Sequence, residues 1–237
     1  VYESFISRLT KKLEEKNLPH PIFIVGQTGT LTRKTENVGH YSIENAIKLS
    51  SIANKYSVAV KEHNGDYLSD EVLITHLASG IGAVNVAPEY GTAETLAYLE
   101  LCKTEKDLLD NGLITETSNL KEVMATHAIN CGRWKKWMLK QQANLTVEEI
   151  FKDENLTQEI LEIAGHYTFN DQEVKDEIAK LYTNLNKYSI DINVKHEFTR
   201  FYSIDGERYV VNAIKRSIGR YMEDLNMEGL TSKLLNK

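Results

Sequence analysis

The sequence predicts an α/β protein, because short apolar stretches alternate three times with amphipathic ones in its first 105 residues. The apolar stretches are long enough for strands and lie at residues 21–26, 58–62 and 83–87. A helix is expected after each strand, at residues 42–56, 69–80 and 92–102. Three strand–helix units in a row favour a parallel sheet with right-handed crossovers. A closed barrel and an open doubly wound sheet are both compatible with three units.

Local signals place several ends of these elements. Ser69 is a favourable N-cap for the second helix, and Gly80 is a natural stop for it. Ser42, with Asn45 three residues later, gives a weaker N-cap signal for the first helix. Pro88 is expected to end the third strand.

An amphipathic helix is predicted at the very start of the chain, where one face carries Tyr2, Phe5, Ile6, Leu9 and Leu13. The first residue is valine and not methionine. A trimmed terminus explains this, and so does a chain that is the C-terminal part of a longer protein.

The remainder of the chain is predicted to be mostly helical. The expected helices are residues 118–140, 146–151, 171–184 and 207–225, and residues 191–202 are expected to form a short strand or an extended arm. The change from strand–helix units to helices alone places a boundary near residue 115. We therefore expect strand–helix units in residues 1–115 and a helical region in residues 116–237.

Composition narrows the function classes. The net charge is -6 over 237 residues, with both signs scattered, which argues against nucleic acid or an anionic membrane as the main partner. No apolar run of about 18 residues and no signal peptide are present, so a soluble, cytoplasmic protein is expected. Cys102 and Cys131 lack metal-ligand spacing and are expected to be reduced thiols, with a disulfide as the alternative.

Polar residues follow each predicted strand. After the first comes Gly26-Gln27-Thr28-Gly29-Thr30, a turn suited to an anion or a sugar hydroxyl because backbone N–H groups converge in such turns. The spacing matches neither a P-loop nor a dinucleotide-binding fingerprint. A turn with no ligand is an equally good interpretation. We take Gln27 and Thr28 as candidate substrate contacts.

The segment after the second strand, Lys61-Glu62-His63-Asn64-Gly65-Asp66-Tyr67-Leu68, is the most informative. Neighbours in a strand point to opposite faces, so Glu62 and His63 cannot both be metal ligands unless the strand has ended. His63 and Asp66 are better placed to converge on Zn²⁺, Mn²⁺ or Co²⁺, and Tyr67 can donate a phenol proton. The alternative is that His63 donates to a carbonyl and Asp66 caps the next turn. Asn64 is a further candidate substrate contact.

The third strand carries Asn85 and is followed by Glu89. An unpaired amide inside an apolar strand costs on the order of 1–3 kcal/mol, so Asn85 needs a partner, for which a substrate hydroxyl is suitable. Glu89 is either a base or a helix-start charge favoured by the helix dipole.

Other candidates are weaker. His127 and His196 are expected to be structural or surface residues, and His166-Tyr167-Thr168-Phe169 is expected to be packing between helices. Residues 132–137, Gly-Arg-Trp-Lys-Lys-Trp, are expected to place lysine cations over packed tryptophan rings on a long helix.

With these motifs in place, the sequence resembles a known family. Residues 61–68, residues 80–88 and the helix at 93–100 resemble the accessory, non-catalytic subunits of class II D-tagatose-1,6-bisphosphate aldolase, also labelled tagatose-6-phosphate kinase. The family carries a similar (E/K)-x-H-x-x-D-Y motif. Ile24-Val25-Gly26 is similar to its V-I-G-T-E strand, and His166-Tyr167-Thr168-Phe169 is similar to its H-Y-S-Y. The likeness is collinear over residues 20–185.

The resemblance implies a (βα)8 TIM barrel of which this chain holds the later part, about three βα units, followed by helices. The sequence also departs from the family's pattern at two places. Thr28 stands where the family has a glutamate, and residues 170–175 contain no arginine. If the family's arginines bind phosphate, this protein is expected to act on a related but different sugar.

Two functional readings follow from the resemblance. One is a metal-dependent epimerase or aldolase-type enzyme on a ketose or ketose phosphate. In it Glu62 or Glu89 would be the proton shuttle, Tyr67 and Asn85 would bind hydroxyls, and His63 and Asp66 would be ligands of a divalent metal. The other is a non-catalytic accessory subunit that stabilises a separate aldolase, with an aldolase subunit or a second copy as partner. A kinase is disfavoured because no phosphate-cradling motif is present.

Overall fold

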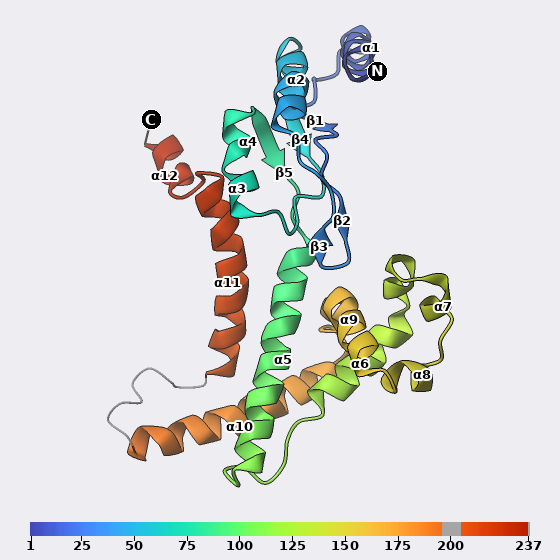
Figure 1. The fold of residues 1–237 in the computed structure, drawn as a ribbon. Helices are drawn as coiled ribbons and strands as arrows, with labels where there is room; N and C mark the ends of the chain where they lie inside the picture. Colours follow the sequence, from blue (N-terminus) through green and yellow to red (C-terminus); the bar gives the residue numbers. More distant parts are fainter. Residues whose placement is uncertain (196–204, 237) are drawn as a thin grey trace. The chain divides into compact units, whose positions relative to one another are not determined.

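A computed structural model describes residues 1–195 and 205–236 (Figure 1). The chain divides into two units, which are described separately below. Unit 1 comprises Val1–Glu89 with Ile218–Lys237, and unit 2 comprises Tyr90–Ser217. The boundary that the sequence predicts near residue 115 thus falls inside unit 2.

Unit 1 contains a parallel sheet of three strands, β1 (Phe23–Gly26), β4 (Ala59–Glu62) and β5 (Ile81–Val84), in the order β1-β4-β5. The parallel sheet confirms the predicted α/β class, while closure into a barrel stays a prediction. The third strand lies earlier than expected and stops at Val84. It stops there because the amide of Ala87 donates to the Asp66 carboxylate at 2.8 Å, so the chain has turned into the next helix.

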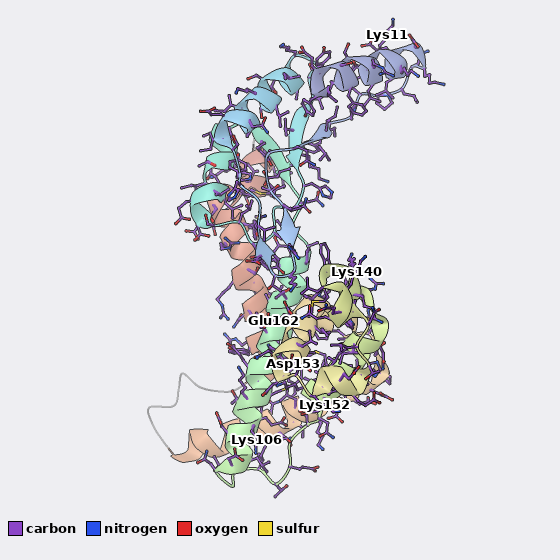
Figure 2. All side chains as sticks on the ribbon, turned by 45° about the vertical axis from the view of Figure 1, so that its right-hand side comes forward. Lys11, Lys106, Lys140, Lys152, Asp153 and Glu162 are labelled. Carbon is purple, nitrogen blue, oxygen red and sulfur yellow. The ribbon has the colours of Figure 1, made fainter. Side chains whose placement is uncertain are left out.

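Helices cover one face of this sheet. α1 (Tyr2–Glu15) packs on α2 (Ile43–Asn54), and α2 packs on β1 and β4, as Figure 1 shows. The core between helices and sheet is formed by Ile6, Ile24, Ala46, Ala53, Val58, Val60 and Ile81. The predicted amphipathic first helix is confirmed, although Phe5 is 54% exposed. Lys11, labelled in Figure 2, lies on its exposed side.

The other face of the sheet carries exposed apolar residues. Phe23 and Val25 alternate with the buried Ile24 and Gly26 along β1, and they expose 41% and 47% of their surface. Parallel sheets are ordinarily covered on both faces, so an apolar face in water is unusual. A small antiparallel hairpin, β2 (Thr32–Arg33) with β3 (Glu36–Asn37), follows β1.

The helix predicted at residues 69–80 is two short helices, α3 (Asp70–Leu73) and α4 (Thr75–Ala78). The break has a local cause, because the side chains of Thr75 and His76 both bond the carbonyl of Val72 and compete with the helical ladder. Gly80 ends α4 with a φ of 78°, as expected. Ser42 accepts from the amide of Asn45, which confirms that N-cap.

The third predicted helix, α5 (Pro88–Asp110), is longer than expected at both ends. Pro88 does not merely end the strand. It occupies the first helical position, where its fixed φ and missing N–H cost nothing. Near the other end of α5, Lys106 pairs with Asp110 at 2.6 Å (Figure 2).

Unit 2 is helical. Besides α5 it contains α6 (Leu120–Cys131), α7 (Lys140–Ala143), α8 (Val147–Phe151), α9 (Glu154–Ala164), α10 (Gln172–Lys195), the first part of α11 (Gly206–Asp224) and two 3-10 helices, η1 (Arg133–Trp137) and η2 (Gly165–Tyr167). Its core includes Leu120, Met124, Trp134, Ile150, Ile160, Leu161 and Leu181. The helices expected at 146–151, 171–184 and 207–225 are confirmed.

The single helix predicted at residues 118–140 is wrong. α6 ends at Cys131 because Gly132 adopts a left-handed φ of 66°, and the chain continues as η1. The buried Trp134 donates its indole N–H to the Ile129 carbonyl at 2.9 Å. The lysine–tryptophan prediction holds on this shorter element, with Lys136 Nζ 4.8 Å from the Trp137 ring.

The arm or strand expected at residues 191–202 is not observed where it can be checked, since α10 runs to Lys195. Residues 196–204, with His196, lie outside the described residues. A last short helix in unit 1, α12, spans Leu230–Leu235. Cys102 and Cys131 are both free thiols, as predicted. Within the described ranges, no helix is both long and apolar enough to cross a membrane.

Candidate functional site

The carboxyl ends of β1, β4 and β5 gather the residues that the sequence singled out. In parallel α/β sheets this edge is where ligands ordinarily bind. The structure sorts the residues there into two hydrogen-bonded networks and a row of polar groups. All of them belong to unit 1.

The first network is centred on Glu62, the last residue of β4, which is fully buried. Its Oε2 accepts a hydrogen bond from the Thr28 hydroxyl at 2.6 Å, and its Oε1 lies 2.8 Å from Nε2 of His76 on α4. Thr28 is 1% exposed, so its hydroxyl faces the carboxylate and not solvent. Glu62 and Thr28 therefore bond to one another. The catalytic role of Glu62 and the substrate-binding role of Thr28 stay predictions.

His76 is bonded through both ring nitrogens. Nδ1 lies 2.9 Å from the Val72 carbonyl, which can only accept, so Nδ1 carries a proton. A second proton must then lie between Nε2 and Glu62. Burial alone lowers the pKa of His76, but the Glu62 carboxylate and the Val72 carbonyl outweigh it and raise the pKa above its usual value. The raised pKa favours the proton on the imidazole of this buried pair. Tyr41 stacks on the imidazole at 4.8 Å between ring centres.

The second network starts at Asp66, which is 4% exposed. Its Oδ1 accepts from the amides of Ala87 at 2.8 Å and Glu89 at 3.1 Å, so it caps the start of α5. Burial raises the pKa of Asp66, the two amides oppose this, and the neighbouring Glu89 charge adds to it. Asp66 thus caps helix α5, which follows β5. It does not cap the turn that directly follows it in the sequence, as the alternative prediction had it.

Glu89 lies in the first turn of α5, where the helix dipole favours a negative charge. Its carboxylate accepts from the Tyr67 amide, from Nη2 of Arg220 at 3.0 Å and from the Tyr221 hydroxyl. Arg220 also donates to the Leu68 carbonyl at 2.7 Å and pairs with Asp70 at 2.8 Å. Glu89 therefore joins the end of α11 to the loop after β4.

The loop between β4 and α3 is strained. Asn64 and Tyr67 have left-handed φ values of 60° and 59°, which an aromatic residue adopts rarely. Between them, Gly65 packs so closely that a Cβ there would lie 2.2 Å from a methyl carbon of Val84. The Tyr221 hydroxyl, whose one proton is shared with Glu89, lies 3.0 Å from the Gly65 carbonyl oxygen. Non-glycine residues in this region often mark functional sites, because packing must compensate the strain.

The row of polar groups lies on the sheet face opposite α2. His63, the first residue beyond β4, is exposed while Glu62 is buried, which confirms that the two point to opposite faces. Gln27 follows β1 and is exposed. The amide of Asn85 donates to the Glu62 carbonyl at 3.0 Å, which continues the ladder and places Asn85 on the face of Ala83 by alternation.

The predicted metal ligands are not assembled into a ligand set. His63 is exposed, and Asp66 is bonded to backbone amides as described above. Among the described residues, no three His, Cys, Asp or Glu side chains are placed to hold a metal ion. These residues alone do not fit a metal centre, so no reaction step is derived through one, and the divalent metal stays a prediction.

Sequence reasoning missed three residues of this region, His76, Arg220 and Tyr221. His76 lies one turn after Val72 in a predicted helix. Its position on the buried side of that helix is the sequence signal that could have pointed to it. Arg220 and Tyr221 follow Glu89 by more than a hundred residues, and no local pattern connects them.

The two weaker candidates belong to unit 2. His127 lies between Asp171 at 2.9 Å and Glu173 at 2.8 Å, as a surface ion pair. His166 packs against Gly91, where a Cβ would lie 2.5 Å from its ring, and its ring centre is 4.0 Å from that of Tyr167. These contacts agree with the structural roles expected for both.

Comparison with known proteins identifies the fold. No family model matches the sequence, and no curated protein matches it. Among solved structures, a probable tagatose 6 phosphate kinase from Sinorhizobium meliloti 1021 superposes with a TM-score of 0.68 at 15% identity, over 94% of this chain and 59% of that chain. The two chains share a fold. This chain therefore spans about three fifths of the length of that protein.

A second solved structure, the fructuronate-tagaturonate epimerase UxaE from Cohnella laeviribosi, gives a TM-score of 0.43 at 14% identity. The match covers 92% of this chain and 41% of that chain.

Proposed function

We propose that the protein acts in carbohydrate metabolism and binds a ketose or ketose phosphate at the carboxyl ends of β1, β4 and β5. The observation that carries the proposal is the row of polar groups Gln27, His63 and Asn85 at the ends of three adjacent strands. Gln27 and His63 are exposed and Asn85 is half-buried. The bonded networks of Glu62 and of Asp66 with Glu89 support this row. Amides and an imidazole suit sugar hydroxyls, which both donate and accept. A protein of the same fold is named a probable tagatose 6 phosphate kinase, which agrees with a sugar ligand.

The reaction we propose is inversion at C4 of the ketose by retro-aldol cleavage and re-addition. A base removes the O4 proton, the C3–C4 bond breaks, and its electron pair forms an enediolate on C2 and C3 while C4 becomes an aldehyde. The enediolate then adds to the opposite face of the aldehyde, which reforms the C3–C4 bond, and the proton returns to O4. Atoms and electrons balance without an oxidant or reductant.

His63 is the best-placed group for this proton transfer, because it is exposed at the strand end. Gln27, Asn64 and Asn85 would hold hydroxyl groups, and the half-buried Tyr67 would donate to an oxygen. Glu62 and Glu89 would support the reaction by holding the loop between β4 and α3 in place, because their carboxylate oxygens are bonded to other protein groups.

A second candidate function is that of an accessory subunit that stabilises a separate aldolase. The observation that favours it is the internal bonding of Glu62, Asp66 and Glu89, which is how structural carboxylates behave. The exposed apolar residues Phe23 and Val25 would then contact the aldolase or a second copy of this chain.

The test is a screen of 2-ketoses and their phosphates for C4 inversion, followed by NMR, with the full chain. Loss of a positioned acid–base group costs about 10²–10⁴-fold in rate, so His63→Ala should lose that much. His20→Ala is the matched control and should keep the wild-type rate, because the ring of His20 pairs with the exposed Glu14 at 3.3 Å and lies outside the strand ends.

Absence of inversion with every sugar, together with stabilisation of a co-purifying aldolase, would replace the enzyme by the accessory function. Measurement of the metal content by mass spectrometry tests the predicted metal site independently of the enzyme and accessory functions. Stoichiometric metal in the wild type that is lost in His63→Ala and Asp66→Ala supports the ligand pair, and retention in both variants contradicts it.

A further inference from the structure

Unit 2 contains a cavity of about 320 Å³, lined by residues of α5, of the segment around the start of α6 and of α9. Its volume lies at the lower end of the range of about 300–1,000 Å³ that is typical of small-molecule sites. The buried Leu99 and the half-buried Cys102 form an apolar part of its wall. Charged residues complete the lining, among them Lys106, which Figure 2 labels. The cavity therefore has the size and the mixed lining of a site for a small ligand.

One residue of this wall, Glu105, is a buried carboxylate that lacks a cation. It is 1% exposed. Its Oε1 accepts from the amide of Ser118 at 2.9 Å and from Nδ2 of Asn184 at 2.6 Å, and its Oε2 accepts from the Ser118 hydroxyl at 2.7 Å. All of these donors are neutral. A buried charge with neutral partners alone is costly, so a cation that enters the cavity would stabilise Glu105.

Two lysines that could compensate Glu105 pair with other carboxylates. Lys106 pairs with Asp110 at 2.6 Å, and Lys180 pairs with Glu116 at 2.9 Å. In residues 1–195 and 205–236, no lysine, arginine or histidine forms an ion pair with Glu105. The compensating cation is thus left to a ligand.

Cations with free capacity lie at the exposed rim of the cavity. Lys103 is exposed, and its ammonium group forms no hydrogen bond or ion pair with any described residue. Nζ of Lys121 lies 3.8 Å from a Glu154 oxygen, which is beyond hydrogen-bonding distance. The rim also carries the exposed Asp107 and Glu122. Because both signs of charge line the cavity, a ligand with both signs suits it better than a simple anion or cation.

We propose that this cavity binds a free α-amino acid with a small aliphatic side chain. The ligand's ammonium group lies toward Glu105, and its carboxylate lies toward Lys103 and Lys121. Its side chain packs against Leu99 and Cys102. Oε2 of Glu105 accepts one hydrogen bond from the described part of the chain, so it has a further lone pair for the ligand's N–H. The site is independent of the proposed sugar function, whose residues belong to unit 1.

Isothermal titration of the full chain with L-leucine tests the proposal, beside two analogues of the same shape. Isoamylamine lacks the carboxylate of leucine, and isocaproate lacks its ammonium group. We expect leucine to bind, and each analogue to bind about tenfold more weakly or worse, because a hydrogen bond to a charged group contributes at least that much.

Three variants locate the two charged ends of the ligand. Glu105→Gln should weaken leucine and isoamylamine about tenfold and leave isocaproate unchanged. Lys103→Met should weaken leucine and isocaproate roughly threefold, as for an exposed ion pair, and leave isoamylamine unchanged. Lys140→Met is the matched control and should keep the wild-type affinity, because Lys140 is exposed on α7 and lies outside the lining (Figure 2).

No binding of leucine overturns the proposal, and so does equal binding of leucine and both analogues. An unchanged leucine affinity in a folded Glu105→Gln also overturns it. Urea unfolding shows whether each variant is folded. If Glu105→Gln does not fold, Lys103→Met and the analogues decide, since Lys103 is exposed. In that case the proposal fails if Lys103→Met binds leucine as the wild type does.

Discussion

Nε2 of His76 lies 2.8 Å from Oε1 of Glu62, and the two side chains are 1% and 0% exposed. This pair connects the end of the central strand β4 to helix α4, directly beneath the loop that carries His63, Asp66 and Tyr67. The candidate site therefore adjoins a buried Glu62–His76 pair.

Breaking this pair should destabilise the protein strongly. Removing one partner of a buried ion pair leaves the other charge uncompensated and typically costs about 3–5 kcal/mol. We expect that loss in the free energy of unfolding for His76→Ala and for Glu62→Gln, measured by urea denaturation.

Two comparisons calibrate the result. Tyr41→Phe removes only the hydroxyl that bonds Ser79 at 2.7 Å and should cost about 1 kcal/mol. His20→Ala at the surface should stay within about 0.5 kcal/mol of the wild type. A cost below 1 kcal/mol for both pair variants would mean that the pair is not formed as described.

Stability should fall as pH rises above neutrality. The pKa of His76 is raised in the folded protein, despite the lowering effect of burial, because Glu62 and the Val72 carbonyl bind its proton. A raised pKa contributes stability that is complete below the unfolded value of about 6.5 and is lost as pH rises through the folded pKa. The slope is at most about 1.4 kcal/mol per pH unit for one proton.

Unfolding curves recorded from pH 6 upward measure this slope. His76→Gln should show a flatter profile than the wild type over the same range. His127 also contributes stability that is lost as pH rises, because Glu173 and Asp171 raise its pKa. The pH profile of His127→Gln is therefore measured beside that of His76→Gln. Identical profiles for wild type and His76→Gln would rule out a charged His76.

Gly65 should tolerate no side chain. An added Cβ would lie 2.2 Å from a Val84 methyl carbon, and overpacking of this kind costs about 1–3 kcal/mol. Gly65→Ala is therefore expected to lower the unfolding free energy by that amount. Gly219→Ala in helix α11 is the control. Among the described residues beyond its own stretch of helix, no atom lies within 4 Å of the added Cβ, and alanine there should stabilise by about 0.5–1 kcal/mol. The same sign for both substitutions would contradict the close contact.

The two cysteines should differ in reactivity. Burial, with a smaller effect of the Glu105 charge, raises the pKa of Cys102 to about 12, so almost no thiolate exists near neutral pH. Cys131 is exposed. Iodoacetamide should label one thiol quickly in the folded protein and the second only after unfolding. Persistence of the fast phase in Cys131→Ser would show that Cys102 is accessible.

Much of the fold was predictable because its signals are local. The apolar runs around Ile24 and Val60 identify strands by themselves, and Ser42 and Gly80 mark helix ends through backbone chemistry. The long helix expected through Cys131 failed at Gly132, where the pattern of tryptophans and lysines continues but the backbone turns left-handed. Periodicity records which residues are buried and does not record where a glycine breaks a helix.

The candidate site was only partly predictable for a different reason. His63 and Glu62 could be assigned to opposite faces from alternation alone, and Glu89 could be placed at a helix start. The side chains that bond to these residues could not be predicted. Arg220 and Tyr221 reach the site from α11, and the fold alone brings them to Glu89. Asp66 looked like a metal ligand because a cap and a ligand both need a carboxylate at that position.

The most direct measurement of the central claim is a crystal structure of the full chain with D-fructose or D-fructose 6-phosphate bound. The predicted result is a sugar at the carboxyl ends of β1, β4 and β5, with hydroxyls at Gln27, His63 and Asn85. A sugar bound elsewhere on the chain would contradict the assignment.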